Sequence, residues 1–234
     1  MSTSIHTVSS STVGTGTFKV YDKDEFIGQT FRDGSWWEDW MHPHMKNAIQ
    51  NNCRDGEHIL DIGANIGSHT VAFSKMGPNQ FISAFEPQKH IFDTLDFNVS
   101  NNALSNVKTY GCALSDAPGQ LQFPKYNVDE INNQGGMSLS SENEGETVDL
   151  KVLDTVMNDE NVSRVCVVKI DVEGHEKRVF KGADKILTVD KPVIFLEDHT
   201  GENVEFLRNK GYCVSKFNEG HNDYIAKYGS CSQF

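Results

Sequence analysis

Residues 59–70 (ILDIGANIGSHT) limit the fold of this chain more than any other segment, because they pass from an apolar run through two glycines into a helical pattern. Gly63 and Gly67 bracket the turn, and glycine lets a backbone approach a ligand closely. A helix that begins at Ser68 presents unpaired N–H groups and a partial positive charge at its first turn. This order of strand, glycine turn and helix predicts the first unit of a nucleotide-binding α/β fold.

Strand-like and helix-like patterns alternate through most of the chain. Strands are predicted at residues 58–62, 81–85, 107–114, 165–170 and 192–196, and around Cys213 and Ile225. Helices are predicted at residues 68–76, 89–100, 171–187 and 202–210. The nearly unbroken apolar run at 165–170 is typical of a central strand covered on both faces. The alternation predicts an α/β class fold with a doubly wound, mostly parallel sheet and helices on both faces.

The N-terminal region departs from this alternation. Residues 1–17 are rich in Ser, Thr and Gly, and we expect them to form a flexible tail. Residues 18–234 would then form a single domain, with residues 18–57 as an N-terminal extension. That extension is expected to contain a hairpin of residues 18–21 and 26–30 and a helix that begins at Trp36.

A second departure lies at residues 119–154, which we interpret as an insertion. Two added strands are expected around residues 121–123 and 148–153. The Asn-, Gly-, Ser- and Glu-rich stretch between them, residues 126–145, is too long for an ordinary connection. Loops of this length are usually functional or disordered, so the stretch is either a lid over the substrate or a mobile insertion.

Charge and composition weigh against two classes of partner, nucleic acids and membranes. The chain has 21 Lys and Arg against 33 Asp and Glu, a formal net charge of −12. Nucleic-acid binding relies largely on Lys and Arg contacts with phosphate, so this balance weighs against a nucleic-acid partner. The sequence contains no run of about 20 apolar residues and no basic, apolar leader of the secretory type. We therefore expect no membrane association and a cytoplasmic location.

The cysteines give no sign of a metal site or a disulfide framework. Five are present, widely spaced and without a C-x-x-C pair: Cys53, Cys112, Cys166, Cys213 and Cys231. Cys112 and Cys166 lie in apolar runs, where a buried thiol acts as a small hydrophobic group. We expect all five to be reduced.

An acid after the second strand bears on the choice of nucleotide. Glu86 lies about where such folds place a ribose-binding carboxylate, which would also reject the 2′-phosphate of NADP. Asn65 stands where a dinucleotide motif has its middle glycine, and Asp61 puts a carboxylate where a pyrophosphate would lie. S-adenosylmethionine carries a sulfonium and an ammonium group and no phosphate, so an acidic loop favours it over NAD. The sequence also lacks the G-x-x-x-x-G-K-[ST] run of a P-loop.

Three motifs together resemble the FkbM family of methyltransferases. They are residues 60–67 (LDIGANIG), residues 85–87 (FEP) and residues 169–176 (KIDVEGHE). The similarity extends over roughly residues 36–198. It implies a seven-stranded class I methyltransferase fold and, most often, O-methylation of sugar or natural-product hydroxyls. The expected acceptor is therefore a glycan or a small hydroxylated molecule.

The resemblance also implies where the methionine part of the cofactor lies. Asp61, Gly63, Asn65 and Gly67 would surround it. Glu38 lies near the start of the helix expected from Trp36. It would cap either the amino group of the cofactor or the end of that helix.

Further residues are implied for the other end of the cofactor. Glu86, followed by Pro87, would hold the ribose. Ala113 and Leu114 would flank the adenine. Asn98, in the helix after Glu86, is a further cofactor residue that the resemblance implies without a particular part of the cofactor.

The acceptor side is expected at the carboxyl end of the fourth strand. Asp171 ends this strand, where ligands bind in open α/β sheets, so it is expected to serve both cofactor binding and catalysis. Glu173 and His175 follow it, and His175 would lie one helical turn from Asp171. The ordinary pKa of a histidine suits His175 to the removal of a hydroxyl proton near neutrality. The alternative reading of this segment is a helix start with early acids that offset the macrodipole.

A divalent cation is a second way to activate the hydroxyl. Asp171 with Glu197 or Asp198, from the end of the next strand, would supply the oxygen ligands that magnesium, manganese or calcium prefer. Otherwise these residues form a polar loop. Three other functions remain open: an NAD-dependent oxidoreductase, a nucleic-acid methyltransferase and a nucleotide-binding protein without catalysis.

Overall fold

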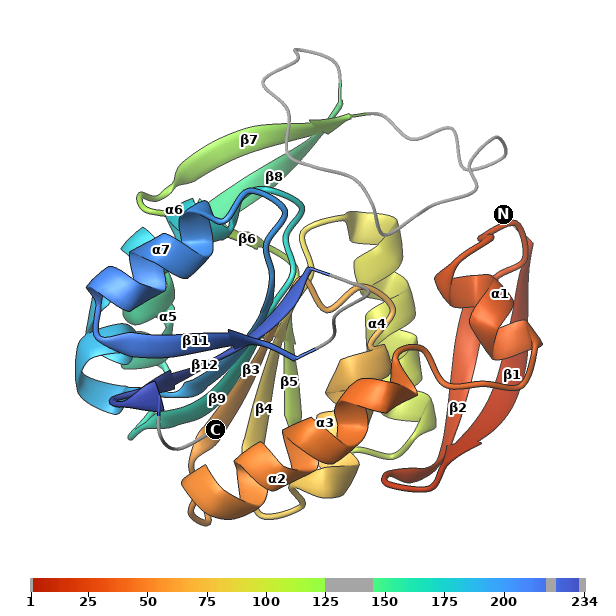
Figure 1. Cartoon of the computed structure of the whole chain (residues 1–234). Coiled ribbons are helices and arrows are strands. Elements are labelled where there is room, and N and C mark those ends of the chain that lie inside the picture. Colours follow the sequence, from red (N-terminus) through yellow and green to blue (C-terminus); the bar gives the residue numbers. More distant parts are fainter. Residues whose placement is uncertain (1, 125–144, 218–221, 232–234) are drawn as a thin grey trace.

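The computed structural model describes residues 2–124, 145–217 and 222–231 and contains a seven-stranded central sheet (Figure 1). Its strand order is β11-β12-β10-β9-β3-β4-β5. The strands are β3 (His58–Ile62), β4 (Phe81–Phe85), β5 (Val107–Tyr110), β9 (Val165–Ile170), β10 (Val193–Glu197), β11 (Tyr212–Lys216) and β12 (Asp223–Tyr228). β12 pairs antiparallel with β10 and β11, and the pairings from β10 to β5 are parallel. The predicted mostly parallel, seven-stranded sheet is confirmed.

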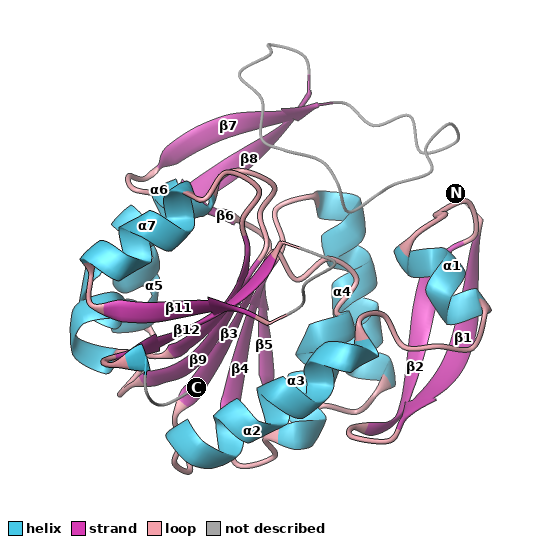
Figure 2. Ribbon diagram, viewed as in Figure 1, coloured by secondary structure: helices cyan, strands magenta, loops and turns pink. Residues whose placement is uncertain are grey.

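Helices cover both faces of this sheet (Figure 2). One face packs against α2 (His42–Asn52), α3 (Ser68–Met76) and α4 (Lys89–Asn101). The other packs against α5 (Leu153–Asp159), α6 (Glu176–Lys181), α7 (Glu202–Asn209) and the short π-helix at Ile186–Asp190. All six residues of β9 are buried, as its apolar run predicts. The doubly wound architecture is therefore confirmed.

The strand predicted at residues 107–114 is divided between two sheets. β5 ends at Tyr110, and a short strand β6 (Ala113–Leu114) leaves the central sheet. It pairs with β8 (Gly145–Lys151), which pairs in turn with β7 (Gly119–Pro124). The two added strands are thus present, and the lid proposed for residues 126–145 lies almost wholly outside the described residues.

The prediction of a flexible tail at residues 1–17 is wrong. Thr3–Ser10 form β1, which pairs along its whole length with β2 (Gly14–Tyr21). Val8 is buried, and the hydroxyls of Thr7 and Thr17 lie 3.0 Å apart across the pair. Short polar residues resemble a tail in composition, yet β-branched threonines pair well on a pleated surface.

The predicted hairpin of residues 18–21 and 26–30 is also wrong, because the strand pairs with β1 and the second segment is helical. The chain turns at Asp24, whose carboxylate accepts a hydrogen bond from the Phe26 N–H at 2.9 Å. Helix α1 (Ile27–Arg32) follows. The helix expected from Trp36 begins later, as a 3-10 turn at Asp39–Met41 that leads into α2.

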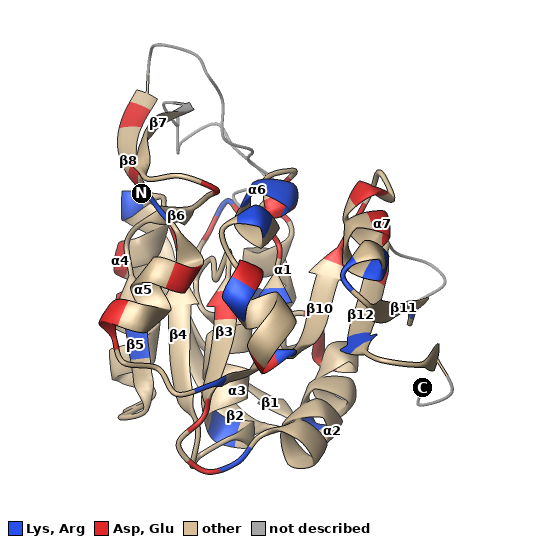
Figure 3. Cartoon of the chain, turned by 90° about the vertical axis from the view of Figure 1, so that its left-hand side faces the viewer, with Lys and Arg blue, Asp and Glu red and all other residues tan. Residues whose placement is uncertain are grey.

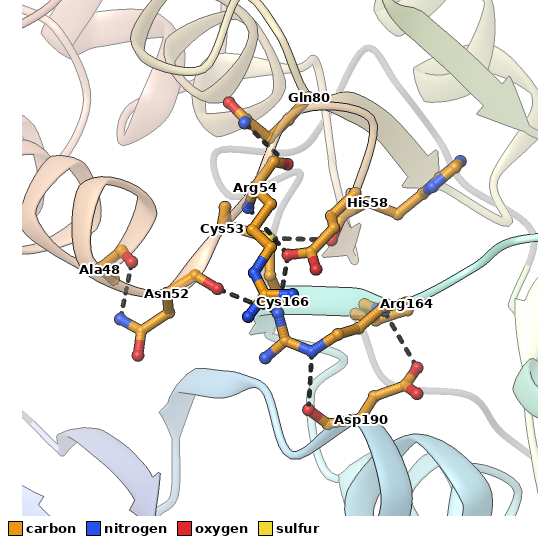
Figure 4. Close-up of a disulfide and its surroundings, with 11 residues drawn as sticks. Ala48, Asn52, Cys53, Arg54, His58, Gln80, Arg164, Cys166 and Asp190 are labelled. Atoms are coloured by element: carbon orange, nitrogen blue, oxygen red, sulfur yellow. Dashed lines mark hydrogen bonds and ion pairs between the residues drawn. A yellow bond between two sulfur atoms is a disulfide. The ribbon is translucent and has the colours of Figure 1, made fainter.

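Two disulfides correct the expectation of reduced cysteines. Cys53, after α2, is bonded to Cys166 in β9, and Cys213 is bonded to Cys231. Figure 4 shows the first bond beside Arg164, whose guanidinium pairs with Glu57 at 2.7 Å. Cys53 and Cys166 are 113 positions apart, so only the tertiary fold reveals that their Cα atoms lie 5.2 Å apart. Cys112 remains a free, buried thiol.

No helix within the described part of the chain combines the length and the apolar character that a membrane crossing requires.

Candidate active site

A cavity of about 210 Å³ opens at the carboxyl ends of β3, β4 and β9. In an open α/β sheet this is the edge at which ligands bind. Most of the residues predicted for the site line it: Glu38, Gly63, Asn65, Glu86, Pro87, Ala113, Leu114, Asp171, Glu173, His175 and Glu197. We call it the cofactor cavity.

The glycine turn after β3 brings the floor of this cavity together. Gly63 and Asn65 have φ angles of 78° and 49°, in the left-handed region. A Cβ atom added to Gly63 would lie 1.8 Å from the carbonyl oxygen of Asp171. Only glycine therefore allows the turn after β3 to lie directly against the end of β9.

Glu86 is buried at the end of β4, with 4% of its surface exposed. Its Oε2 accepts a hydrogen bond from the Asn65 N–H at 3.1 Å, and its Oε1 accepts one from the Gln88 N–H at 2.9 Å. Burial raises the pKa of Glu86 to about 7. Each carboxylate oxygen has a further lone pair, so Glu86 retains the capacity to accept from two ligand hydroxyls.

Lys169 is a site residue that the sequence analysis did not single out. Its ammonium lines the cofactor cavity and lies 3.2 Å from the Asp171 carboxylate. Burial opposes its charge, but the carboxylates of Asp171, Asp61 and Glu38 outweigh burial and raise the pKa of Lys169. The signal in the sequence was a single lysine inside the apolar run 165–170, where it is also the first residue of the motif at residues 169–176.

Glu38 enters the cavity from the N-terminal extension. Its backbone is left-handed, with φ 53°, and its Oε2 lies 2.9 Å from Nε2 of His69 in α3. His69 also lines the cavity and was given no role from the sequence. The left-handed turn places the Glu38 carboxylate over the start of α3 rather than along a helix that begins at Trp36.

Three predicted cofactor residues do not line the cavity. Asp61 is fully buried, and its Oδ2 accepts a hydrogen bond from the Thr70 hydroxyl at 2.6 Å. Gly67 instead forms the N-cap of α3. The amide of Asn98 binds backbone: Oδ1 accepts from the Lys19 N–H at 2.7 Å, and Nδ2 donates to the carbonyls of Lys19 and Ile66. Asn98 therefore joins β2 to α4 and to the turn.

The segment after β9 is a loop, not the first turn of a helix. Glu173 and Gly174 have φ angles of 50° and 91°, and α6 begins only at Glu176. The Glu176 carboxylate accepts hydrogen bonds from the N–H groups of Val172 and Gly174, at 3.2 and 3.1 Å. The prediction that Asp171 and His175 lie one helical turn apart is therefore wrong. Both residues nevertheless line the cavity.

Glu173 and His175 differ in their surroundings. Burial, together with the nearby carboxylates of Asp171, Glu197 and Glu176, raises the pKa of Glu173 to about 7. Burial and the neighbouring Arg178 lower the pKa of His175, whose Nε2 lies 3.2 Å from the Ser115 hydroxyl. Of the two groups, Glu173 is thus the one whose pKa lies near neutrality.

The three predicted metal ligands, Asp171, Glu197 and Asp198, line one neighbouring cavity, but Asp198 is already occupied by backbone donors. Asp198 is buried, with Oδ1 accepting from the N–H groups of Thr200 and Gly201 and Oδ2 from that of Val204 at 2.9 Å. It serves the loop before α7 and is not available as a ligand beside Asp171 and Glu197. Across residues 2–124, 145–217 and 222–231, no group of three or more His, Cys, Asp or Glu side chains is arranged to hold a metal ion.

Known proteins resemble this chain in sequence. Methyltransferase 1 of Beauveria bassiana is 29% identical over 184 residues, which cover 69% of this chain and 74% of that protein. The hexuronic acid methyltransferase AglP of Haloferax volcanii is 32% identical over 148 residues, 61% of this chain and 56% of AglP. The 31-O-demethyl-FK506 methyltransferase FkbM of Streptomyces tacrolimicus is 25% identical over 204 residues, 73% of this chain and 77% of that protein.

Solved structures share the fold. The methyltransferase FkbM from Methylobacillus flagellatus superposes with a TM-score of 0.53 at 16% identity, covering 74% of this chain and 44% of that one. The family model described as the methyltransferase FkbM domain matches residues 61–227. Since this match extends from the end of β3 into the last strand of the sheet and includes most of the cavity, the chain belongs to the FkbM family of S-adenosylmethionine-dependent methyltransferases.

Proposed function

We propose that this methyltransferase methylates a hydroxyl oxygen of a glycan or a small hydroxylated molecule, using S-adenosylmethionine as the donor. Two relatives support this acceptor class by name, one acting on a hexuronic acid and one on 31-O-demethyl-FK506. The observation that carries the proposal is the position of Glu173. Its carboxylate lines both the cofactor cavity and a neighbouring cavity on the α7 side.

The residues present suit the donor. S-adenosylmethionine, when bound, supplies a methyl group on a sulfonium cation and leaves as S-adenosylhomocysteine. Glu86 is placed to accept from ribose hydroxyls, and Ala113 and Leu114 give an apolar wall for the adenine. Glu38 and Asp171 supply negative charge for the cationic end, with Lys169 holding Asp171 in place.

Glu173 is the proposed proton acceptor. As the acceptor oxygen forms its bond to the methyl carbon and the carbon–sulfur bond breaks, the hydroxyl proton passes to the Glu173 carboxylate. A pKa near 7 suits a general base at neutral pH, because the group is ionised yet still basic. His175 lines the cofactor cavity and contacts Ser115, so we assign it to holding this wall.

The proposal is tested by release of S-adenosylhomocysteine from a panel of neutral, amino and acidic methyl glycosides, polyols, simple amines and carbon nucleophiles, followed by mass spectrometry of the products. A methyl ether in at least one product supports it. Methylation confined to nitrogen or carbon acceptors would contradict it.

A nicotinamide oxidoreductase is the competing function for this type of fold. It is tested by comparing protection against thermal unfolding by S-adenosylhomocysteine and by NAD. Protection by the first compound only is expected, since Asp61 and Glu38 place negative charge near the glycine turn. Binding without turnover over the whole acceptor panel would instead favour a nucleotide-binding protein without catalysis.

A further inference from the structure

A second cavity, of about 200 Å³, adjoins the cofactor cavity and shares Asp171, Glu173 and Glu197 with it. Its other walls come from the start of α6 and from the loop between β10 and α7. Figure 3 shows acidic segments at the upper end of β10 and the start of α7. Since Glu173 lies on the wall between the two cavities, an acceptor in the second one would present its hydroxyl to the cofactor.

The described lining of this second cavity is rich in hydrogen-bond acceptors and poor in free donors. Six carboxylates and two basic side chains line it. Both basic groups are already paired: Lys177 with Glu202 at 2.7 Å, and His199 with Glu197 at 3.1 Å. Burial, followed by the nearby Asp171 carboxylate, raises the pKa values of both Glu173 and Glu197.

A buried amide independently indicates a missing donor. Asn203 lines this cavity with 6% of its surface exposed, and its Oδ1 has no hydrogen-bond partner among the described residues. Its Nδ2 faces the carboxylates of Asp198 and Glu176, at 3.4 and 3.5 Å, so this orientation of the amide is the favourable one. A buried acceptor without a donor is costly, and a ligand N–H group would satisfy it.

The backbone N–H groups of the nearby turns are not free to bind an anion. The N–H groups of Gly201 and Val204, at the beginning of α7, already donate to the Asp198 carboxylate. In the same way, the Glu176 carboxylate accepts hydrogen bonds from the N–H groups of Val172 and Gly174. A carboxylate or phosphate on the acceptor would therefore meet negative charge with no free donor from these turns.

We propose that the second cavity is the acceptor subsite and that it recognises a hydroxylated acceptor carrying a protonated amine, held by Glu197 and Asn203. This inference rests on the proposed function, since it assigns an acceptor to the same reaction. An ammonium group supplies three donors and one positive charge, which match the unpaired Asn203 oxygen and the excess of carboxylates.

The test measures binding of three matched probes to the protein loaded with S-adenosylhomocysteine, at low ionic strength: methyl glucosaminide, methyl glucoside and methyl glucuronide. We expect the amine to bind at least about tenfold more tightly than the neutral glycoside, since a charged hydrogen bond contributes about 1.5–3 kcal/mol. The glucuronide should bind most weakly. A preference for the neutral or the acidic probe, or no binding of the amine, would overturn the inference.

Two variants separate this subsite from a general effect of charge. Glu197→Gln should reduce the preference for the amine to within about twofold. Glu205→Gln removes an exposed carboxylate from α7 that does not line the cavity, and it should keep the full preference. Equal effects of the two variants would show long-range attraction and not a subsite. Binding and methylation are measured separately, so a protein that methylates hydroxyls but shows no binding preference for the amine would refute this inference and leave the proposed function standing.

Discussion

The Lys169 ammonium lies 3.2 Å from the Asp171 carboxylate, and both residues come from the carboxyl end of β9. Lys169 is nearly buried, and Asp61 and Glu38 are the other carboxylates that raise its pKa. One lysine thus compensates three acids that come from β3, β9 and the N-terminal extension. This arrangement allows an acidic cofactor cavity to exist at the centre of the sheet.

Lys169→Met should strongly destabilise the protein. Removing the ammonium leaves the buried Asp61 and the 35%-exposed Asp171 uncompensated, and solvent screening at Asp171 lowers the expected cost to about 2–3 kcal/mol, below that of a fully buried pair. Urea unfolding at pH 7 measures the loss. Lys108→Met is the matched control, since it breaks an exposed pair with Glu160 and should cost no more than about 1 kcal/mol. Adding Asp171→Asn to Lys169→Met should restore part of the stability; a further loss would show that the two charges are not coupled.

Glu86→Gln should weaken S-adenosylhomocysteine binding by about 10- to 100-fold, because it replaces charged hydrogen bonds worth about 1.5–3 kcal/mol. Calorimetric titration measures the affinity, and a thermal unfolding curve checks the fold. Asp93→Asn, an exposed change on α4, is the control and should leave the affinity unaltered. Unchanged affinity in Glu86→Gln would remove Glu86 from the ribose site.

Local patterns predicted the parts of this structure that depend on local chemistry. The strand, turn and helix at residues 59–76 and the buried strand β9 follow from periodicity and glycine placement. The loop at Asp171 was read as a helix because its acids resemble a helix start, whereas the left-handed Glu173 and Gly174 delay the helix to Glu176.

Features that depend on distant partners escaped the sequence. β1 is a strand because β2 pairs with it. Cys53 and Cys166 are 113 positions apart in the sequence, and only the fold brings them together. Beyond the neighbouring Asp171, Lys169 compensates Asp61 and Glu38 on other elements, and the Asn98 amide binds the backbone of Lys19 and Ile66. None of these partners lies within reach of a sequence window.

Chelation of metals should leave turnover unchanged. The Lys169 ammonium already compensates Asp171, and Asp198 is occupied by the backbone before α7. Of the remaining pair, Asp171 lies 3.2 Å from the Lys169 ammonium and Glu197 lies 3.1 Å from His199, so both carboxylates already have a side-chain partner. Assays before and after exhaustive EDTA treatment test this point. A loss of turnover that magnesium or manganese restores would contradict it.

The Cys53–Cys166 bond should stabilise the fold more than the Cys213–Cys231 bond, because it closes a longer loop. With separations of 113 and 18 residues, the chain-entropy model gives a difference of about 1–2 kcal/mol. Urea unfolding of Cys53→Ser and Cys213→Ser, without reductant, compares the two. Four alkylated cysteines in the unreduced, unfolded wild-type protein, in addition to Cys112, would show that neither bond forms.

Proton transfer to Glu173 predicts the pH dependence of turnover. The base acts as a carboxylate, so a pKa of about 7 means that kcat rises with pH through about 7 and levels off above it. Saturating S-adenosylmethionine is needed, because Glu86 also has a pKa of about 7 and its protonation would affect cofactor binding. Glu173→Gln should lower kcat by about 100-fold or more and abolish the rise, while S-adenosylhomocysteine binding is retained. His175→Gln should keep the rise. If His175 were the base instead, the midpoint would lie below 6.5, since burial and Arg178 lower its pKa, and the rise would disappear in His175→Gln.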